Sequence, residues 1–229
     1  MSKNIMPFNG VLPEIAPDAF IAPSADALGR DVFSRVISAT RLDLLIAVSA
    51  VAISFVVGSI LGSAAGYWGG KLDIILSRTL DTIMAFPIFV LAMGIVAALG
   101  NTIENIVYAT AIINVPFYAR LVRAEVNIRR NSGFVQSAKL SGNSDLRILA
   151  LQIFPNTLPP MMVQISLNLG WAILNAAGLS FIGLGVRPPT PEWGIMVAEG
   201  ANFIVSGEWW LAVFPGLWLM LAVFTFNLL

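Results

Sequence analysis

Residues Gln136–Pro155 read QSAKLSGNSDLRILALQIFP, a polar and basic stretch between apolar runs long enough to cross a membrane. Gly142 divides this stretch into two short segments, and glycine favours the left-handed conformation that ends many helices. Asn143 or Ser144 can cap the helix that follows, with Asp145 in its first turn. The sequence therefore predicts two short helices that meet at a glycine and form a compact knob, shaped to fit a groove on a partner.

The second short helix also has apolar surface that is available for docking. Because proline lacks an N–H group and clashes with the preceding turn, we expect Pro155 to end the regular pattern. The apolar residues are Leu146, Leu149, Leu151 and Ile153.

The composition is that of a membrane protein. Of the 229 residues, 57% are hydrophobic and only 11% are charged, and the mean hydropathy is +0.82. Soluble domains carry about 25% charged residues, so lipid must be the main solvent of this chain. The net charge is zero, which gives no reason to expect binding to nucleic acid.

The residue types that are missing restrict the chemistry. Cysteine and histidine are both absent, which excludes disulfides, thiol nucleophiles, histidine bases and Cys/His metal sites. The sequence has no GxxxxGK[ST] phosphate-binding loop, so we do not expect this chain to hydrolyse ATP. We therefore predict no catalytic, cofactor-binding or metal site on it.

Five segments are apolar over the length of about 20 residues that a helix needs to cross the hydrocarbon core. Each must satisfy its own backbone hydrogen bonds in lipid, which favours helix. The predicted fold is thus all-α, a polytopic transmembrane helix bundle with about five spans. The spans are Leu42–Trp68, Ile74–Leu99, Ile106–Val122, Met161–Leu184 and Trp209–Leu229.

The basic residues predict the orientation of the spans. Eight of them lie on the side that contains Gly142, and that side should be cytoplasmic by the positive-inside rule. Residues 1–41 then form a polar extracytoplasmic segment, and residues 42–229 form the transmembrane domain with a cytoplasmic loop at about 125–156. The basic residues are Lys71, Arg78, Arg120, Arg123, Arg129, Arg130, Lys139 and Arg147.

The spacing of Gln136-Ser137-Ala138, Gly142 and Ile153-Phe154-Pro155 resembles the EAA loop of the membrane-spanning subunits of ABC importers. Gln136 and Ser137 replace the usual Glu and Ala, which preserves the helix but not a contact made by the glutamate charge. The resemblance implies that this loop is held by an ATP-hydrolysing subunit; on charge alone it would be an ordinary basic loop. The implied coupling residues are Gln136, Ser137, Ala138, Gly142, Asp145, Ile153 and Pro155.

Two further segments resemble the permeases of dipeptide, oligopeptide and nickel importers: Leu28–Arg35 (LGRDVFSR) and Gly183–Gly194 (GLGVRPPTPEWG). The resemblance implies a subunit of a bacterial or archaeal inner membrane. Its implied partners are a second, similar permease, two ATP-binding subunits that carry ATP and Mg, and an extracytoplasmic solute-binding protein. The family usually has six spans, so we expect the first span to be lacking here, which would also explain the basic residues in residues 1–41.

Polar residues recur along one stripe of the fourth predicted span. Gln164, Asn168, Trp171 and Asn175 follow one another at helical spacing. Amides that face lipid are costly, so this stripe should face other helices or water. It is either a wall of a translocation pathway or a set of hydrogen bonds that pack helices together. Asn114 on the third span is a weaker candidate of the same kind.

Two other groups of residues have candidate roles. Gly58, Gly62 and Gly66 repeat every four residues and form a groove for close helix packing, either within this chain or against the second permease. Glu192 and Trp193 lie in the outer loop, where they are candidates for contact with the binding protein or an adjacent loop. Trp193 alternatively anchors the chain at the membrane interface.

These features together predict a permease subunit of an ATP-driven importer for peptides or a related small solute. It would form half of the pathway and transmit the movement of a separate ATPase. The alternatives are a non-transporting assembly subunit, a truncated permease, or a secondary transporter. A secondary transporter would need intramembrane charges or an inverted repeat, and the sequence offers neither.

Overall fold

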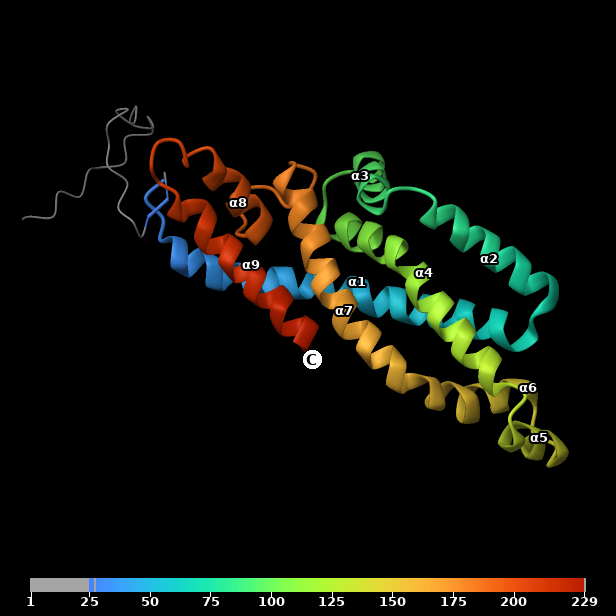
Figure 1. Ribbon diagram of the computed structural model, residues 1–229. Coiled ribbons are helices and arrows are strands. Elements are labelled where there is room, and N and C mark those ends of the chain that lie inside the picture. The colour runs from blue at the N-terminus through green and yellow to red at the C-terminus, as the bar shows by residue number, and fades with distance from the viewer. Residues whose placement is uncertain (1–24, 27, 229) are drawn as a thin grey trace, which may run out of the picture.

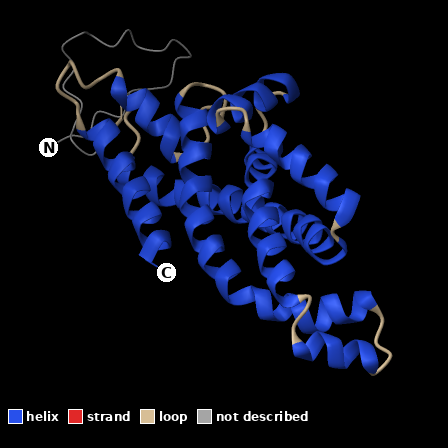
Figure 2. Cartoon of the chain, turned by 45° about the vertical axis from the view of Figure 1, so that its right-hand side comes forward, coloured by secondary structure: helices blue, strands red, loops and turns tan. Residues whose placement is uncertain are grey.

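The computed structural model describes residues 25, 26 and 28–228, so most of the predicted extracytoplasmic segment 1–41 lies outside the described residues. The described residues form helices and loops, with one isolated bridge between Ala25 and Asp31 (Figure 2). The helices are α1 (Val32–Trp68), α2 (Gly70–Met84), α3 (Ile88–Leu99), α4 (Ile103–Arg129), α5 (Gly133–Leu140), α6 (Asp145–Ile148), the π-helical segment η1 (Leu149–Ile153), α7 (Phe154–Phe181), α8 (Trp193–Ala201) and α9 (Trp210–Leu228).

Four helices in the described chain are long and apolar enough to cross a membrane: α1, α4, α9 and the helix that runs from α6 through η1 and α7. The pair α2 and α3 would make a fifth span, but its two halves meet at 88°. The predicted all-α bundle with about five spans is confirmed. The prediction of one unbroken helix over Ile74–Leu99 is wrong, because Pro87 keeps the residue before it out of the helical conformation and α3 starts afresh after it.

Helix α1 begins at Val32, well before the predicted start at Leu42. Asp31 caps it, since its side chain accepts a hydrogen bond from the N–H of Ser34 at 2.8 Å. Hydropathy alone does not detect this start, because the first turns of α1 carry Ser34 and Arg35 among apolar residues. The helix therefore extends 37 residues and passes along the length of the bundle (Figure 1).

Helices α1 and α4 lie in close contact at the three glycines predicted to form a groove. A Cβ atom built on Gly58 would come within 2.6 Å of Tyr118 Cβ. One on Gly62 would come within 2.4 Å of the Ala119 carbonyl oxygen, and one on Gly66 would lie 2.7 Å from that of Arg123. The groove is thus occupied by the backbone of α4 from the same chain.

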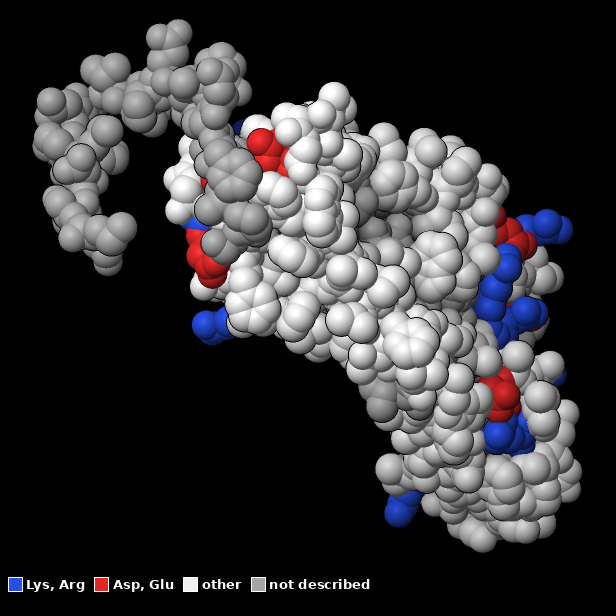
Figure 3. Space-filling model, turned by 60° about the vertical axis from the view of Figure 1, so that its left-hand side comes forward, with Lys and Arg blue, Asp and Glu red and all other residues white. Residues whose placement is uncertain are grey.

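The two ends of the bundle differ in shape. At one end α5 and α6 project beyond the long helices, and at the other α8 packs beside the start of α1 and α9 (Figures 1 and 2). Figure 3 shows one face of the molecule, on which Lys, Arg, Asp and Glu gather toward opposite sides with uncharged residues between them. This distribution fits a protein whose middle lies in lipid.

Candidate functional site

The projecting elbow, residues 133–153, turns at Gly142. Gly142 has a φ of +79°, in the left-handed region that glycine adopts without strain. Its N–H donates to the carbonyl of Lys139 at 3.0 Å, and the N–H of Asn143 donates to that of Ala138 at 3.1 Å. These paired bonds are those of a Schellman cap. The predicted first helix and its glycine cap are therefore both present.

The start of α6 differs from the prediction. Ser144 occupies the N-cap position but makes no capping bond through its side chain, and the side chain of Asn143 donates instead to the carbonyl of Ala138. Asp145 accepts a hydrogen bond of 2.5 Å from the hydroxyl of Tyr67, on α1. The carboxylate of Asp145 thus connects the elbow to the C-terminal end of α1 rather than only stabilising its own helix.

Pro155 does not end the helix, contrary to the prediction. The chain continues from α6 through η1 into α7, and the N–H of Phe154 donates to the carbonyl of Leu149, five residues earlier. A π turn of this kind shifts the hydrogen-bond pattern just before Pro155, which has no N–H to contribute. As a result the elbow and the membrane-spanning α7 form one helix over Asp145–Phe181.

The apolar residues of the elbow divide between its interior and its surface. Leu149 and Ile153 are buried in its small core, together with Ala138, so these three cannot dock directly onto a partner. Leu146 and Leu151 are 67% and 66% exposed. Leu140, which is not among the apolar residues predicted for docking, is 90% exposed at the end of α5. Of the other predicted coupling residues, Gln136, Ser137, Gly142, Asp145 and Pro155 are exposed.

The polar stripe of α7 borders a cavity of about 400 Å³ between α4, α7 and α9. All five predicted stripe and wall residues line it, and Asn227 of α9 joins them. Asn227 was missed because nothing in its own helix marks it, and only the packing of α9 against Gly170 brings it there. The five predicted residues are Asn114, Gln164, Asn168, Trp171 and Asn175.

The hydrogen bonds that these amides donate remain within their own helices. Gln164 Nε2 donates to Asn168 Oδ1, also on α7, at 2.9 Å. Asn175 Nδ2 donates to the carbonyl of Trp171, one turn back, at 2.9 Å. These bonds do not connect neighbouring helices, so packing through interhelical hydrogen bonds gains no support from them. The amide side chains therefore line the cavity without connecting the helices that form it.

Glu192 and Trp193 are buried, and their predicted contact with a partner or with the membrane interface is wrong. The exposed fraction of the residue surface is 0% for Glu192 and 1% for Trp193. The carboxylate of Glu192 caps α8 by accepting from the N–H groups of Gly194 and Ile195 at 2.9 and 2.8 Å. The backbone N–H of Trp193 donates to Asp43 Oδ2 at 3.1 Å. These residues hold the loop between α7 and α8 against α1 instead.

Glu192 also lies beside the buried carboxyl of Asp43. Burial raises the pKa of Glu192, and the N–H groups that it accepts from oppose this rise. Two neighbouring buried carboxyls cannot both ionise without a large cost in free energy. Sequence reasoning could not find this pair, because its members lie on α1 and at the start of α8.

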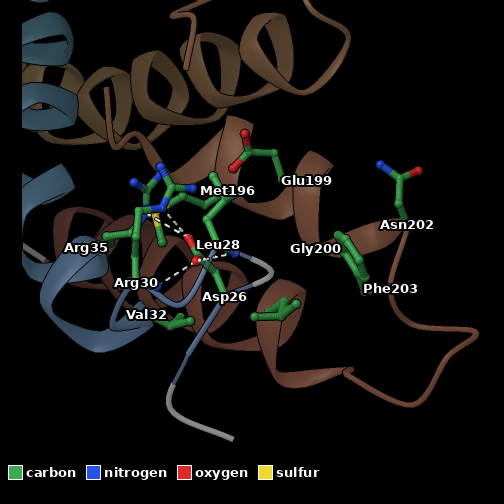
Figure 4. A pocket seen from close by; sticks show the side chains of 11 residues that line it. Asp26, Leu28, Arg30, Val32, Arg35, Met196, Glu199, Gly200, Asn202 and Phe203 are labelled. Carbon is green, nitrogen blue, oxygen red and sulfur yellow. Dashed lines mark hydrogen bonds and ion pairs between the residues drawn. The ribbon is translucent and has the colours of Figure 1, made fainter. Parts of the chain in front are cut away.

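A second cavity of about 220 Å³ lies at the same end of the molecule, between the start of α1 and α8 (Figure 4). Two arginines meet one carboxylate there: Arg30 Nε lies 2.6 Å and Arg35 Nε 3.8 Å from Asp26 Oδ2. Glu199 of α8 borders the same space. These pairs connect the segment before α1 to its first turns, which stabilises this end of the bundle.

The chain has about five membrane spans, a helical elbow at one end and an amide-lined cavity among its spans. This architecture is that of a membrane-spanning transport subunit. The model of the family described as "Binding-protein-dependent transport system inner membrane component" matches residues 58–229, and the chain belongs to this family. It is thus a permease subunit of an ABC importer and not an enzyme.

Several relatives support this assignment. A dipeptide transport system permease protein from Alkalihalophilus pseudofirmus is 43% identical over 204 residues, which are 89% of this chain and 67% of that protein. A probable D,D-dipeptide transport system permease protein from Escherichia coli is 43% identical over 203 residues, 89% of this chain and 68% of that protein. A glutathione transport system permease protein from Pectobacterium atrosepticum is 40% identical, with coverage of 89% and 67%.

The fold is also that of a solved transporter subunit. A chain from the MetNI methionine ABC transporter, in inward-facing conformations, superimposes with a TM-score of 0.71 over 86% of this chain and 93% of its own length. The two sequences are 14% identical, so this similarity concerns the fold alone.

Proposed function

We propose that this subunit carries peptides or a related small solute across a bacterial or archaeal cytoplasmic membrane. It forms half of the pathway, and a second, similar permease forms the other half. The relatives named for dipeptides, D,D-dipeptides and glutathione support a peptide-type solute. An extracytoplasmic binding protein delivers the solute, and two ATP-binding subunits carry the ATP and Mg.

The elbow is proposed as the docking element for an ATP-binding subunit. Its exposed leucines support this role, because Leu140, Leu146 and Leu151 are apolar side chains on an element that projects from the bundle. Large apolar side chains exposed on such an element are typical of surfaces where another protein binds. The basic residues of the same end support a cytoplasmic position.

The cavity between α4, α7 and α9 is proposed as part of the pathway. The helix that starts in the elbow at Asp145 also carries Gln164, Asn168 and Asn175 at this cavity. A displacement of the elbow by the ATPase would therefore move the amides directly. This continuity of one helix from elbow to cavity is the observation on which the proposed mechanism rests.

Replacement of Leu140 by Glu tests the docking role. Since Leu140 is 90% exposed, the substitution should leave the fold intact. A charge in place of this exposed apolar side chain should reduce co-purification of the ATP-binding subunit and ATP-driven peptide uptake by about ten-fold or more.

Val205→Glu is the matched control, since Val205 is 98% exposed in the loop between α8 and α9, at the opposite end. It should leave capture of the ATPase unchanged. Normal capture and uptake by the Leu140→Glu variant would disprove the docking role of this surface.

A further inference from the structure

The cavity between α4, α7 and α9 contains a buried hydrogen-bond donor that no other described residue satisfies. Asn168 is only 3% exposed, and its Oδ1 accepts from Gln164. Its Nδ2 lies near the buried hydroxyl of Tyr118, but neither group makes a hydrogen bond of normal geometry. An unsatisfied buried polar group costs about 1–3 kcal/mol, and such groups in proteins almost always have a partner. Asn168 therefore offers a donor to an occupant of the cavity that it lines.

Three other amides can offer acceptors to the same occupant. The Nδ2 groups of Asn114, Asn175 and Asn227 donate to backbone carbonyls four residues earlier, at 2.8, 2.9 and 2.8 Å. These bonds use the amide nitrogen and fix each side chain against its own helix. The amide oxygen is then the group that each side chain can present to a ligand. The three oxygens come from α4, α7 and α9, so they approach the cavity from different sides.

The cavity is also uncharged and partly aromatic. None of the described residues that line it carries a charge, and Trp171 and Phe117 contribute ring surface. A carboxylate finds no positive partner among these residues, so we expect the carboxylate of a bound peptide to remain outside the cavity, where it keeps its hydration. An ammonium group would instead find amide oxygens and aromatic faces, both of which attract it.

We propose that this cavity is a transient binding site for short peptides within the membrane. The ammonium and N–H groups of the peptide donate to the oxygens of Asn114, Asn175 and Asn227, and a peptide carbonyl accepts from Asn168 Nδ2. Because these contacts involve only backbone groups of the peptide, the site tolerates different side chains. Neutral partners also hold the peptide weakly enough to release it. This inference rests on the proposed function, since it assumes that the solute is a peptide.

Equilibrium binding of labelled dialanine to the complete transporter in lipid nanodiscs, without nucleotide or binding protein, tests the site. The wild-type transporter should bind dialanine, and Asn168→Leu and Asn175→Leu should each weaken this binding by about ten-fold or more. N-acetyl-dialanine, which lacks the ammonium, should bind the wild type as weakly as dialanine binds these two variants. Asn202→Leu is the control, because Asn202 makes the same kind of one-turn backbone bond but is exposed at the outer end.

The outcomes separate this inference from the proposed function. Yield of the assembled transporter and its basal ATPase rate show whether each variant has folded. If the wild type imports dialanine but does not bind it in nanodiscs, or if Asn168→Leu changes neither the binding nor the KM of uptake, the binding site is disproved and the proposed function stands. Equal binding of N-acetyl-dialanine disproves recognition of the ammonium. If the wild type imports no peptide, the proposed function itself fails.

Discussion

Gly142 shows how one residue sets the geometry of the elbow. A Cβ at this position would meet no atom within 4 Å. A larger residue is therefore disfavoured by the backbone φ of +79° and not by a steric clash. For most residues the left-handed conformation costs about 1–2 kcal/mol, whereas asparagine adopts it more readily. Gly142→Leu should therefore distort the turn between α5 and α6, while Gly142→Asn should preserve it.

We expect Gly142→Leu to lower peptide uptake and capture of the ATP-binding subunit without loss of membrane insertion. Gly142→Asn serves as the matched control and should remain close to wild type. Both quantities can be measured on membranes from cells that express the full transporter. If the two variants behave alike, the turn at Gly142 has no part in coupling.

The buried pair of Asp43 and Glu192 gives a second prediction at this scale. Asn at position 43 can still accept from the N–H of Trp193 and can also donate to Glu192, so Asp43→Asn should change stability by no more than about 1 kcal/mol. Asp43→Leu removes the acceptor and should cost about 1–3 kcal/mol, because the N–H of Trp193 is then buried without a partner. Thermal unfolding of the purified subunit in detergent measures both.

The same pair predicts the direction of a pH effect. Burial raises the pKa of Glu192, so the folded protein holds this proton more tightly than the unfolded chain. The stabilisation is complete below the ordinary glutamate pKa of about 4.3 and is lost as pH rises through the raised value. The melting temperature should thus fall with rising pH, and less steeply in Glu192→Gln, which removes the titrating carboxyl. An equal slope in both proteins would contradict the raised pKa of Glu192.

Single residues also mark the limit of prediction from sequence. Glu192 and Trp193 sit in a loop rich in proline, and their types and position favour exposure at an interface. Their burial depends on Asp43 and Val36, which are about 150 residues away along the chain. No local pattern encodes such a contact, so only the three-dimensional structure reveals it.

At the scale of helices, the sequence predicts most of the architecture. The long apolar runs locate the spans, and Gly142 locates the end of α5 near its predicted place, because both signals are local. The predicted helix boundaries are wrong at two prolines, and the two errors have opposite sign. Pro87 breaks a span that was predicted to be continuous, and Pro155 lies within a helix that it was predicted to end. At Pro155 a π turn accommodates the missing N–H, whereas at Pro87 the chain leaves the helix and α3 begins anew.

The continuity of α6, η1 and α7 leads to a prediction for the element as a whole. Leu151 is exposed and Gln152 is half-buried, so changing both to glycine removes little core but softens the helix between elbow and cavity. Each glycine costs about 1 kcal/mol of helix stability relative to alanine. The double glycine variant should keep ATPase activity and lose coupled uptake. The double alanine variant, which preserves a rigid helix, should transport more than the glycine variant does.

A simple comparison decides the result. Uptake per ATP hydrolysed should be clearly lower with glycines than with alanines at the same two positions. If the ratio is the same in both variants, the connection does not need to be rigid, and movement reaches the cavity by another route.

At the scale of the whole molecule, the cavity is the feature that sequence predicts only in part. The stripe on α7 is visible from its spacing, since one helix carries all of its members. Asn227 belongs to α9 and comes near the stripe only through packing, so its share in the cavity could not be foreseen. The family assignment depends on local motifs, whereas the chemistry of the cavity depends on three helices that meet in space.

The helix over Asp145–Phe181 has 37 residues, which corresponds to a rod of about 55 Å, well beyond the hydrocarbon thickness of about 30 Å. If this helix pivots near its middle as one body, its two ends move in opposite directions. Pushing the elbow end toward the bundle would then carry Phe181 outward at the opposite end. Such a pivoting helix would open one end of the pathway while it closes the other, so the two ends would not be open at the same time.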